Sequence, residues 1–240
     1  MKHIAIRRPV YVWELPVRLF HWINAFAIAV LFLTGMYIAN PILVAPGEAV
    51  MHFIIGTMRY WHGIAAFIFT ANMIYRAFWF WAGNEYAKIR FWKKVFWQDL
   101  INTIRYYLFM RAEHRGHLGH NALAQISYIV FIWIFGVVMI FTGFAMRVGT
   151  DPSGVGGMLF SWVIPFMHNE NMVRMVHHVL AWAYVVFLLI HLYLVFRQDI
   201  LDDDATVSSI ISGYKYELPT TGQSEAVHSS DTQPALTKGD

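Results

Sequence analysis

Long apolar stretches alternate with polar connections along most of the 240-residue chain. Each stretch has the length of about 20 mostly apolar residues that a helix needs to cross the hydrocarbon core of a bilayer. No small-residue cleavage site follows the first stretch, so we interpret it as a retained helix and not as a signal peptide. The pattern predicts four transmembrane helices, at about 17–39, 58–82, 122–146 and 173–197.

The composition agrees with a membrane protein and excludes several kinds of metal site. Hydrophobic residues make up 58% of the chain and charged residues only 14%, against about 25% charged residues in a soluble domain. Cysteine is absent, which excludes disulfides, iron–sulfur clusters, thiolate-bound zinc and c-type haem within this chain. Histidine must therefore carry any metal chemistry.

Lysine and arginine are distributed unevenly among the polar connections. The first 18 residues hold four of them, connection 83–121 holds seven, and the chain from 197 onward holds three. Connection 40–57 holds none, and connection 147–172 holds only Arg147. The positive-inside rule then predicts that both termini and connection 83–121 are cytoplasmic. Because the basic residues lie between apolar segments, the net charge of +3 indicates topology and not a nucleic-acid partner.

Two connections and the tail have distinct patterns. Residues 91–110 place apolar side chains at helical spacing, which predicts an amphipathic helix on the cytoplasmic membrane surface. The glycine-rich outer loop 149–171 carries an apolar patch, which indicates either a short helix that docks an external partner or an ordinary interfacial segment. The predicted fold class is thus an all-α membrane protein, with a four-helix domain over 1–215 and a disordered cytoplasmic tail over 216–240.

Histidines inside the apolar segments are functional candidates, because ionisable side chains are costly in a membrane. His177 and His191 are fourteen residues apart, which on a helix is about 21 Å along the axis and about 40° around it. They therefore share one helix face at two depths. His178 is about 140° from His191 around the axis, so we leave it out of the candidate site.

Depth also pairs the histidines of different segments. His21 lies near the cytoplasmic start of the first segment, at the depth of His191, and His62 lies near the outer start of the second, at the depth of His177. Two neutral imidazoles on opposite sides of an iron porphyrin give six-coordinate b-type haem. We therefore predict two haem b groups, ligated by His21/His191 and His62/His177. A packing or proton-relay role is the alternative for any one histidine, but four matched in depth favour haem.

Glycines and arginines near these depths are weaker signals. Gly35, Gly136 and Gly143 permit close approach of either a flat ligand or another helix. Arg59 and Arg174 each precede a proposed outer ligand by three residues. They are candidates to pair with haem propionates, and the alternative is that they extend to lipid headgroups.

Four stretches carry a family resemblance: "LPVRLFHWINAFAIAVLFLTG", "RYWHGIAAFIF", "GHNALA" and "RMVHHVLAWAYVVFLLIHLY". Together they resemble the b-type cytochrome subunit of membrane-bound nickel–iron uptake hydrogenases, over roughly residues 8–215. The related cytochrome b anchors of formate dehydrogenase or thiosulfate reductase are the alternative. The "GHN" sequence and the long outer loop favour the hydrogenase branch.

The resemblance implies an electron-transfer subunit in a bacterial cytoplasmic membrane. In that family a large nickel–iron subunit on the periplasmic side splits hydrogen, a small iron–sulfur subunit conducts the electrons, and the cytochrome delivers them to quinone. The outer haem would then receive electrons first, and the inner haem would pass them on near the cytoplasmic face.

Similarity to the formate dehydrogenase relatives also implies a quinone pocket beside the inner haem. His120 and Asn121 are the candidates to hydrogen-bond a quinone carbonyl, with Gln125 as a third. The alternative is that they cap the following helix, since asparagine is a favoured cap. Two other classes stay open: a structural anchor without redox function, and a transporter with histidine proton relays, which the lack of paired broken helices disfavours.

Overall fold

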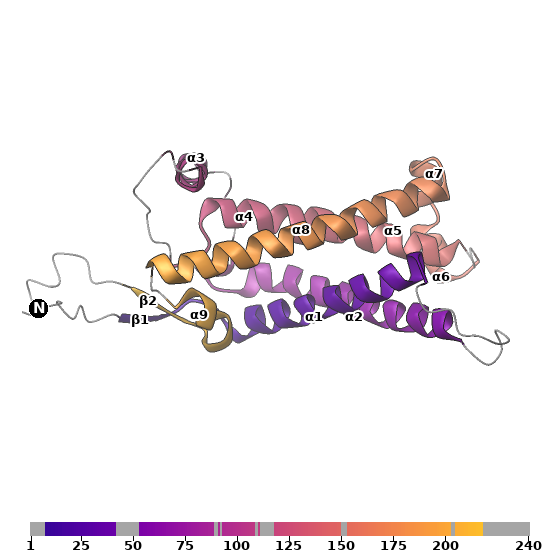
Figure 1. The fold of residues 1–240 in the computed structure, drawn as a ribbon, viewed down its shortest axis with the longest axis horizontal. Helices are drawn as coiled ribbons and strands as arrows, with labels where there is room; N and C mark the ends of the chain where they lie inside the picture. The colour runs from indigo at the N-terminus through magenta and orange to yellow at the C-terminus, as the bar shows by residue number, and fades with distance from the viewer. Residues whose placement is uncertain are drawn as a thin grey trace, which may run out of the picture.

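The structure, a computed structural model, describes residues 8–41, 53–88, 91, 93–108, 110, 118–149, 153–202 and 205–217. Four long helical rods run side by side and form an elongated bundle (Figure 1). In chain order the elements are β1 Arg8–Tyr11, α1 Leu15–Ala39, α2 Ile54–Ala82, the 3-10 turn η1 Glu85–Ala87, α3 Lys94–Tyr107, α4 Ala122–Tyr128, the π-helical segment η2 Ile129–Phe135, α5 Gly136–Val148, α6 Val155–Phe160, α7 Val163–Phe166, α8 Glu170–Asp202, α9 Thr206–Ser212 and β2 Tyr214–Glu217.

Among the described residues, four helices are long and apolar enough to cross a membrane, as the sequence predicts. Each runs a few residues beyond its predicted range. The second span begins at Ile54 and the fourth at Glu170, each before its predicted start. The third span, Ala122–Val148, is composite, because α4, η2 and α5 follow one another without a break.

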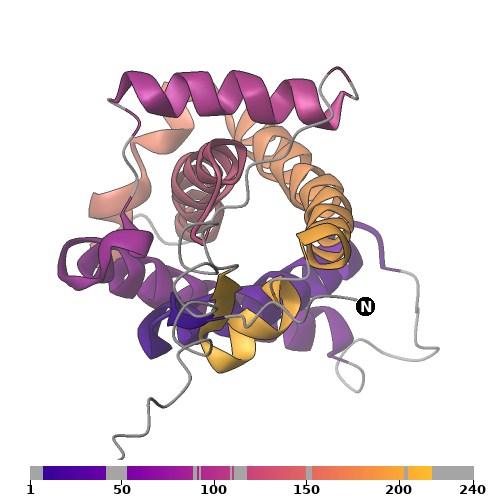
Figure 2. The ribbon, with the colours of Figure 1, turned by 90° about the vertical axis from the view of Figure 1, so that its left-hand side faces the viewer.

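The spans pack mainly in two pairs, α1 with α2 and α5 with α8, and α2 also contacts α5. Seen from one end, α1 and α2 lie on one side of the bundle and the other two spans lie opposite them (Figure 2). Between α1 and α2, Nδ2 of the buried Asn72 donates to the carbonyl oxygen of Phe20 over 3.0 Å. This bond fixes the helix turn that precedes His21.

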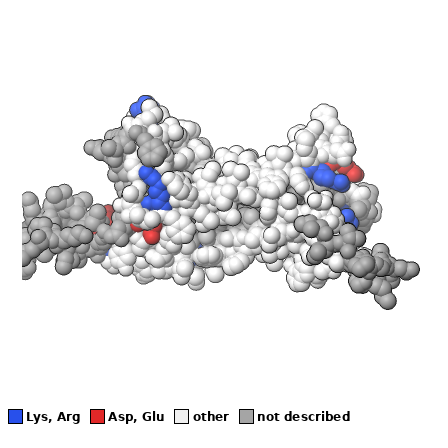
Figure 3. Space-filling view, in the orientation of Figure 1, with Lys and Arg blue, Asp and Glu red and all other residues white. Residues whose placement is uncertain are grey.

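Charged side chains gather near the two ends of the bundle, and the middle of the face in Figure 3 shows none. Many large apolar side chains of the spans are exposed, among them Phe26, Leu33 and Ile74, each about two-thirds accessible. An uncharged apolar band around a helical bundle is what a bilayer requires. The pattern therefore agrees with a membrane-spanning protein.

The short elements divide between the two ends (Figure 1). β1 and β2 pair antiparallel, with Arg8 opposite Glu217 and Tyr11 opposite Tyr214, at the end that also carries α3 and α9. The two strands were not predicted, because nearly the whole chain separates them and no local pattern signals their pairing. β2 continues to Glu217, two residues into the range predicted as tail, and residues 218–240 lie outside the described residues.

α3 is the amphipathic helix that the sequence predicts, although it is shorter than 91–110. It runs across the ends of the spans instead of along them (Figures 1 and 2). The carboxylate of Asp99 accepts from the backbone N–H of Ala122 over 3.1 Å, which ties α3 to the start of the third span. This transverse orientation is the one an interfacial helix adopts.

The outer loop forms two short helices, α6 and α7, at the opposite end (Figure 1). Val155, Met158 and Phe166 are each more than 70% exposed. Short helices with an apolar surface agree with the predicted pattern, and the choice between partner docking and a membrane interface stays a prediction.

Candidate functional site

The inner histidines belong to the first and last spans, and the fold brings them together. The ring centres of His21 and His191 are 6.4 Å apart, with the rings inclined by 45°. A metal–imidazole bond is about 2 Å long, and the ring centre lies about 1 Å beyond the bonded nitrogen. Two imidazoles on opposite sides of one metal therefore have ring centres about 6 Å apart, and the observed distance fits this arrangement.

Aromatic packing holds the ring of His191. Phe187, one helix turn earlier, stacks on it with ring centres 5.5 Å apart, and Phe131 of η2 stacks on Phe187 at 4.2 Å. The hydroxyl of Tyr184 donates to the carbonyl oxygen of Phe131 over 2.5 Å. The π-helical segment is thus connected to His191 through Phe131 and Phe187, and π segments occur frequently at functional sites.

The outer histidines each meet a threonine of a neighbouring span. Nδ1 of His62 lies 2.9 Å from Oγ1 of Thr34 in α1. Nδ1 of His177 lies 2.8 Å from Oγ1 of Thr142 in α5. His62 and His177 also interact electrostatically across the bundle. This interaction agrees with the predicted pairing of His62 with His177, and the two threonines are hydrogen-bond partners that the sequence analysis missed.

The threonines determine which ring nitrogen carries the proton. Oγ1 of Thr34 lies 2.6 Å from the carbonyl oxygen of Val30, and Oγ1 of Thr142 lies 2.7 Å from that of Val138. A carbonyl oxygen only accepts, so each hydroxyl donates its hydrogen to the carbonyl. The hydroxyl oxygen is then the acceptor for an Nδ1–H of the imidazole. This leaves the lone pair on Nε2, where a metal binds.

Two of the three glycines adjoin these rings. A Cβ added at Gly35 would lie 3.2 Å from Cε1 of His62, and one added at Gly143 would lie 3.2 Å from Cε1 of His177. Gly136 instead faces Met73, and a Cβ added at Gly136 would lie 3.2 Å from Cε of Met73. Gly35 and Gly143 therefore let the outer imidazoles approach closely, whereas Gly136 serves helix packing.

The histidine set fits b-type haem better than a free metal ion. Among the described residues there is no group of three or more histidine or acidic side chains that would hold a metal ion, whereas structural zinc requires four protein ligands. A haem needs only two axial ligands from the protein, because the porphyrin supplies the others. The two pairs, set in an apolar bundle, provide that donor set at two positions.

The candidate quinone residues lie at the inner end. Oδ1 of Asn121 accepts from the backbone N–H of Ala124 over 2.8 Å, so Asn121 caps α4, as the alternative predicted. Nε2 of Gln125 donates to the carbonyl oxygen of His120 over 3.0 Å. The ring of His120 packs 4.6 Å from that of Trp13. Asn121 and Gln125 thus both use their side chains in hydrogen bonds at the start of α4, whereas the ring of His120 packs on Trp13.

Two buried cations near His120 were not found from the sequence. Arg76 and Lys215 are only 4% and 3% exposed, and both act electrostatically on His120, as do His191 and His21. His120 as a residue is exposed, yet the protein packed around its ring, followed by the charges of Lys215 and Arg76, lowers the pKa of its side chain to about 4. His120 is therefore a neutral imidazole at physiological pH.

This low pKa predicts a pH-dependent stability that His120→Gln reduces. In the unfolded chain histidine titrates near pH 6.5, so between pH 6.5 and 4 the unfolded state binds a proton that folded His120 does not. The contribution is complete above pH 6.5 and is lost as the pH falls toward 4. Thermal unfolding in detergent at pH 7, 6 and 5 is expected to show a smaller fall in Tm for His120→Gln than for wild type. Equal falls in both proteins would contradict the low pKa.

The arginines at the outer end are exposed. Arg59 and Arg174 keep accessible side chains near the outer ends of α2 and α8. Arg147 was not predicted here, yet its guanidinium would lie 3.0 Å from a Cβ placed at Gly63, next to His62. A glycine after the histidine was the only sequence signal for this contact. His178 is half-buried beside His177.

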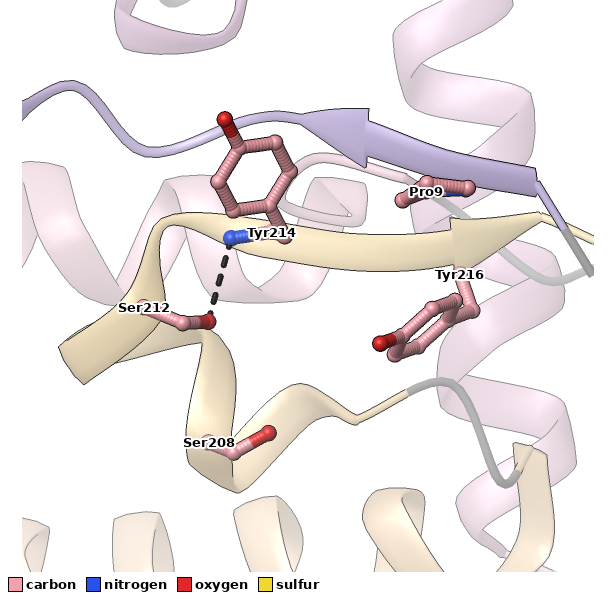
Figure 4. A pocket seen from close by; sticks show the side chains of 5 residues that line it. All are labelled: Pro9, Ser208, Ser212, Tyr214 and Tyr216. Carbon is pink, nitrogen blue, oxygen red and sulfur yellow. Dashed lines mark hydrogen bonds between the residues drawn. The ribbon is translucent and has the colours of Figure 1, made fainter.

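A separate pocket of about 440 Å³ lies between α9 and the strand pair, at the α3 end of the bundle (Figure 4). Its lining consists of Pro9, Ser208, Ser212, Tyr214 and Tyr216. None of these is a histidine or a charged residue, so the pocket offers no axial ligand. It is not the predicted redox site.

Comparison with known proteins agrees with these features. The family model described as prokaryotic cytochrome b561 matches residues 12–213. A probable Ni/Fe-hydrogenase B-type cytochrome subunit of Cupriavidus necator is 38% identical over 213 residues, which cover 87% of each chain. The corresponding protein of Rhodobacter capsulatus is 34% identical over 90% of this chain and 84% of its own.

A probable Ni/Fe-hydrogenase 1 B-type cytochrome subunit of Escherichia coli is 32% identical over 85% of this chain and 90% of its own. The hydrogenase branch of the resemblance is thereby confirmed over the formate dehydrogenase and thiosulfate reductase alternative. With its four apolar spans and paired histidines, the chain belongs to the prokaryotic cytochrome b561 family, among the Ni/Fe-hydrogenase B-type cytochrome subunits.

Proposed function

We propose that this chain conducts electrons from a Ni/Fe hydrogenase to the membrane quinone pool through two b-type haems. His21 and His191 would hold the inner haem, and His62 and His177 the outer haem. The observation that supports the proposal best is the distance of 6.4 Å between the ring centres of His21 and His191, together with the threonines that hold Nδ1 of His62 and of His177. Hydrogen itself would be split on another subunit.

The proposed orientation places both termini in the cytoplasm of a bacterial cell. The basic connections support it, and the strand pair, α3 and α9 share one end of the bundle (Figure 1). The outer end, with α6 and α7, would then face the small iron–sulfur subunit and, beyond it, the large nickel–iron subunit. The names of the relatives, as subunits of Ni/Fe hydrogenases, support such partners.

The chain's own residues perform three tasks at the haem sites. The four histidines would supply the nitrogen ligands, the threonines orient the outer rings, and apolar side chains of the bundle would exclude water. When bound, each haem supplies a one-electron redox centre. Arg59 and Arg174 would pair with propionates at the outer end, because guanidinium groups bind carboxylates well.

The proposed quinone site lies at the inner end, beside His120. A neutral imidazole both donates and accepts a hydrogen bond, which suits a quinone carbonyl and its reduced hydroxyl. The nearby charges of Arg76 and Lys215 favour a negatively charged group there. Asn121 would contribute through its Nδ2, since its Oδ1 already caps α4.

Haem quantitation on the purified hydrogenase complex tests the proposal. We expect two b-type haems per copy of this chain, both reduced by hydrogen and both reoxidised by added quinone. A complex with fewer than two haems per chain would contradict the assignment of both pairs. A complex without a reducible b-type absorption band would leave the structural anchor as the function.

A further inference from the structure

We infer that Thr34 and Thr142 are positioning residues that lower the reduction potential of the outer haem. Each threonine would act through the histidine whose Nδ1–H it accepts, and neither would touch the iron. The inference rests on the proposed function, because it assumes that His62 and His177 are the outer ligands. It adds a role for two side chains that lie one position before the glycines against the same rings.

The two threonine sites have nearly the same geometry. In each, a Thr-Gly pair on one span serves the histidine of the next: Thr34 and Gly35 serve His62, and Thr142 and Gly143 serve His177. The distances from hydroxyl to ring nitrogen are 2.9 and 2.8 Å, and those from each glycine's ideal Cβ to the ring are both 3.2 Å. Two separate helix pairs thus present their histidines to a threonine in the same way, although His62 also hydrogen-bonds to the backbone of Leu31.

Both hydroxyls are shielded from solvent. Thr34 is 8% exposed and Thr142 is fully buried. The opposite tautomer, with the proton on Nε2, would turn the lone pair of Nδ1 toward the lone pairs of Oγ1 unless the hydroxyl gave up its bond to the helix carbonyl. Because buried polar groups are costly to leave unpaired, the threonines hold the tautomer that offers Nε2 to a metal.

The inner pair lacks this arrangement. Within the described part of the chain, the buried Nδ1 of His21 has no hydrogen-bond partner, and His191 is held by stacking on Phe187. An acceptor at the second ring nitrogen makes a histidine a more basic ligand, and a more electron-donating ligand stabilises the oxidised metal. The threonines therefore lower the outer potential and leave the inner one unchanged.

The test is a redox titration of the hydrogenase complex that carries Thr34→Val and Thr142→Val, singly and together. Valine keeps the branched shape and removes the hydroxyl acceptor, while the backbone of Leu31 still bonds to His62 in Thr34→Val. We expect each substitution to raise the ratio of reduced to oxidised outer haem about threefold at a fixed potential. The net free energy of one hydrogen bond changes an equilibrium constant by about this factor. The double variant should reach about tenfold, which for a one-electron couple is 59 mV. Variants at His62, which lack the outer haem, identify its component in the titration.

Two sets of variants control for structure. Thr70→Val removes a hydroxyl that donates only to the carbonyl of Ala66 in the same span, so both haems should titrate as in wild type. Thr34→Ser and Thr142→Ser keep the acceptor and should keep the wild-type potential and the wild-type low-spin electron paramagnetic resonance signals. Loss of the outer haem in the valine variants, with retention in the serine variants, would also support the inference.

The outcomes separate this inference from the proposed function. Two haems in wild type with unchanged outer potential in the double valine variant would overturn the threonine role alone. The same shift in Thr70→Val would overturn it as well, because the effect would then not pass through a histidine. A wild-type complex without an outer haem would overturn the proposed function and this inference together.

Discussion

Replacing His177 with alanine is expected to remove one of the two b-type haems and to leave the absorbance of the other unchanged. His177 would supply one of only two protein ligands to the outer iron, and Thr142, which now accepts from its Nδ1, cannot substitute as a ligand. His62→Ala should leave the same remaining haem, because it removes the opposite ligand. Haem quantitation and reduced-minus-oxidised spectra of the purified complex measure both effects.

His178→Ala is the matched control for this experiment. His178 lies next to His177 in α8, but consecutive residues point about 100° apart on a helix, and only His177 bonds to Thr142. The control should keep two haems per chain. Retention of both haems in His177→Ala, with loss of one in His178→Ala, would show that the assignment of the ligand by helix phase is wrong.

The sequence predicted the four spans because the length and apolar composition that a bilayer requires are properties of each segment by itself. The four long helices follow directly from that signal. What it could not predict depends on contacts between distant segments. The strand pair joins Arg8–Tyr11 to Tyr214–Glu217, and the π-helical turn in the third span depends on neighbours such as Tyr184 of α8.

The sequence suggested which histidines would pair, but it did not suggest the residues that contact them. Depth and helix phase place His21 with His191 and His62 with His177, since both follow from residue spacing on regular helices. The ring centres of the inner pair lie 6.4 Å apart in the structure, while ligation itself stays a proposal. A repeated Thr-Gly sequence, at 34–35 and 142–143, was the available signal for the outer hydrogen bonds.

Arg76 and Lys215 show why the inner end was harder to predict. Arg76 lies within an apolar span and Lys215 in a region that looked like the end of the domain. They are only 4% and 3% exposed, because Arg76 packs over the rings of Phe20 and Tyr128 and Lys215 lies opposite Val10 in the strand pair. Sequence spacing does not predict these contacts, because the residues that make them belong to distant parts of the chain.

Replacing His191 with alanine is expected to nearly abolish hydrogen-dependent quinone reduction while hydrogen still reduces the haem that remains. His191 is fourteen residues from His177 on α8, about 21 Å along the axis. Without the inner redox centre, electrons would stop at the outer end, far from His120 and the proposed quinone site. Spectroscopy under hydrogen, followed by addition of quinone, measures reduction and reoxidation of the remaining haem separately.

Hydrogen oxidation with a soluble viologen dye is the control, because it requires only the partner subunits and should keep the wild-type rate. His21→Ala should behave in the same way as His191→Ala, since the two rings form one pair. His62→Ala should differ, because the block would then lie before the inner haem, and hydrogen would no longer reduce any haem of this chain. If His191→Ala still reduced quinone at the wild-type rate, electrons would leave from the outer end, and the proposed order of the two pairs would be wrong.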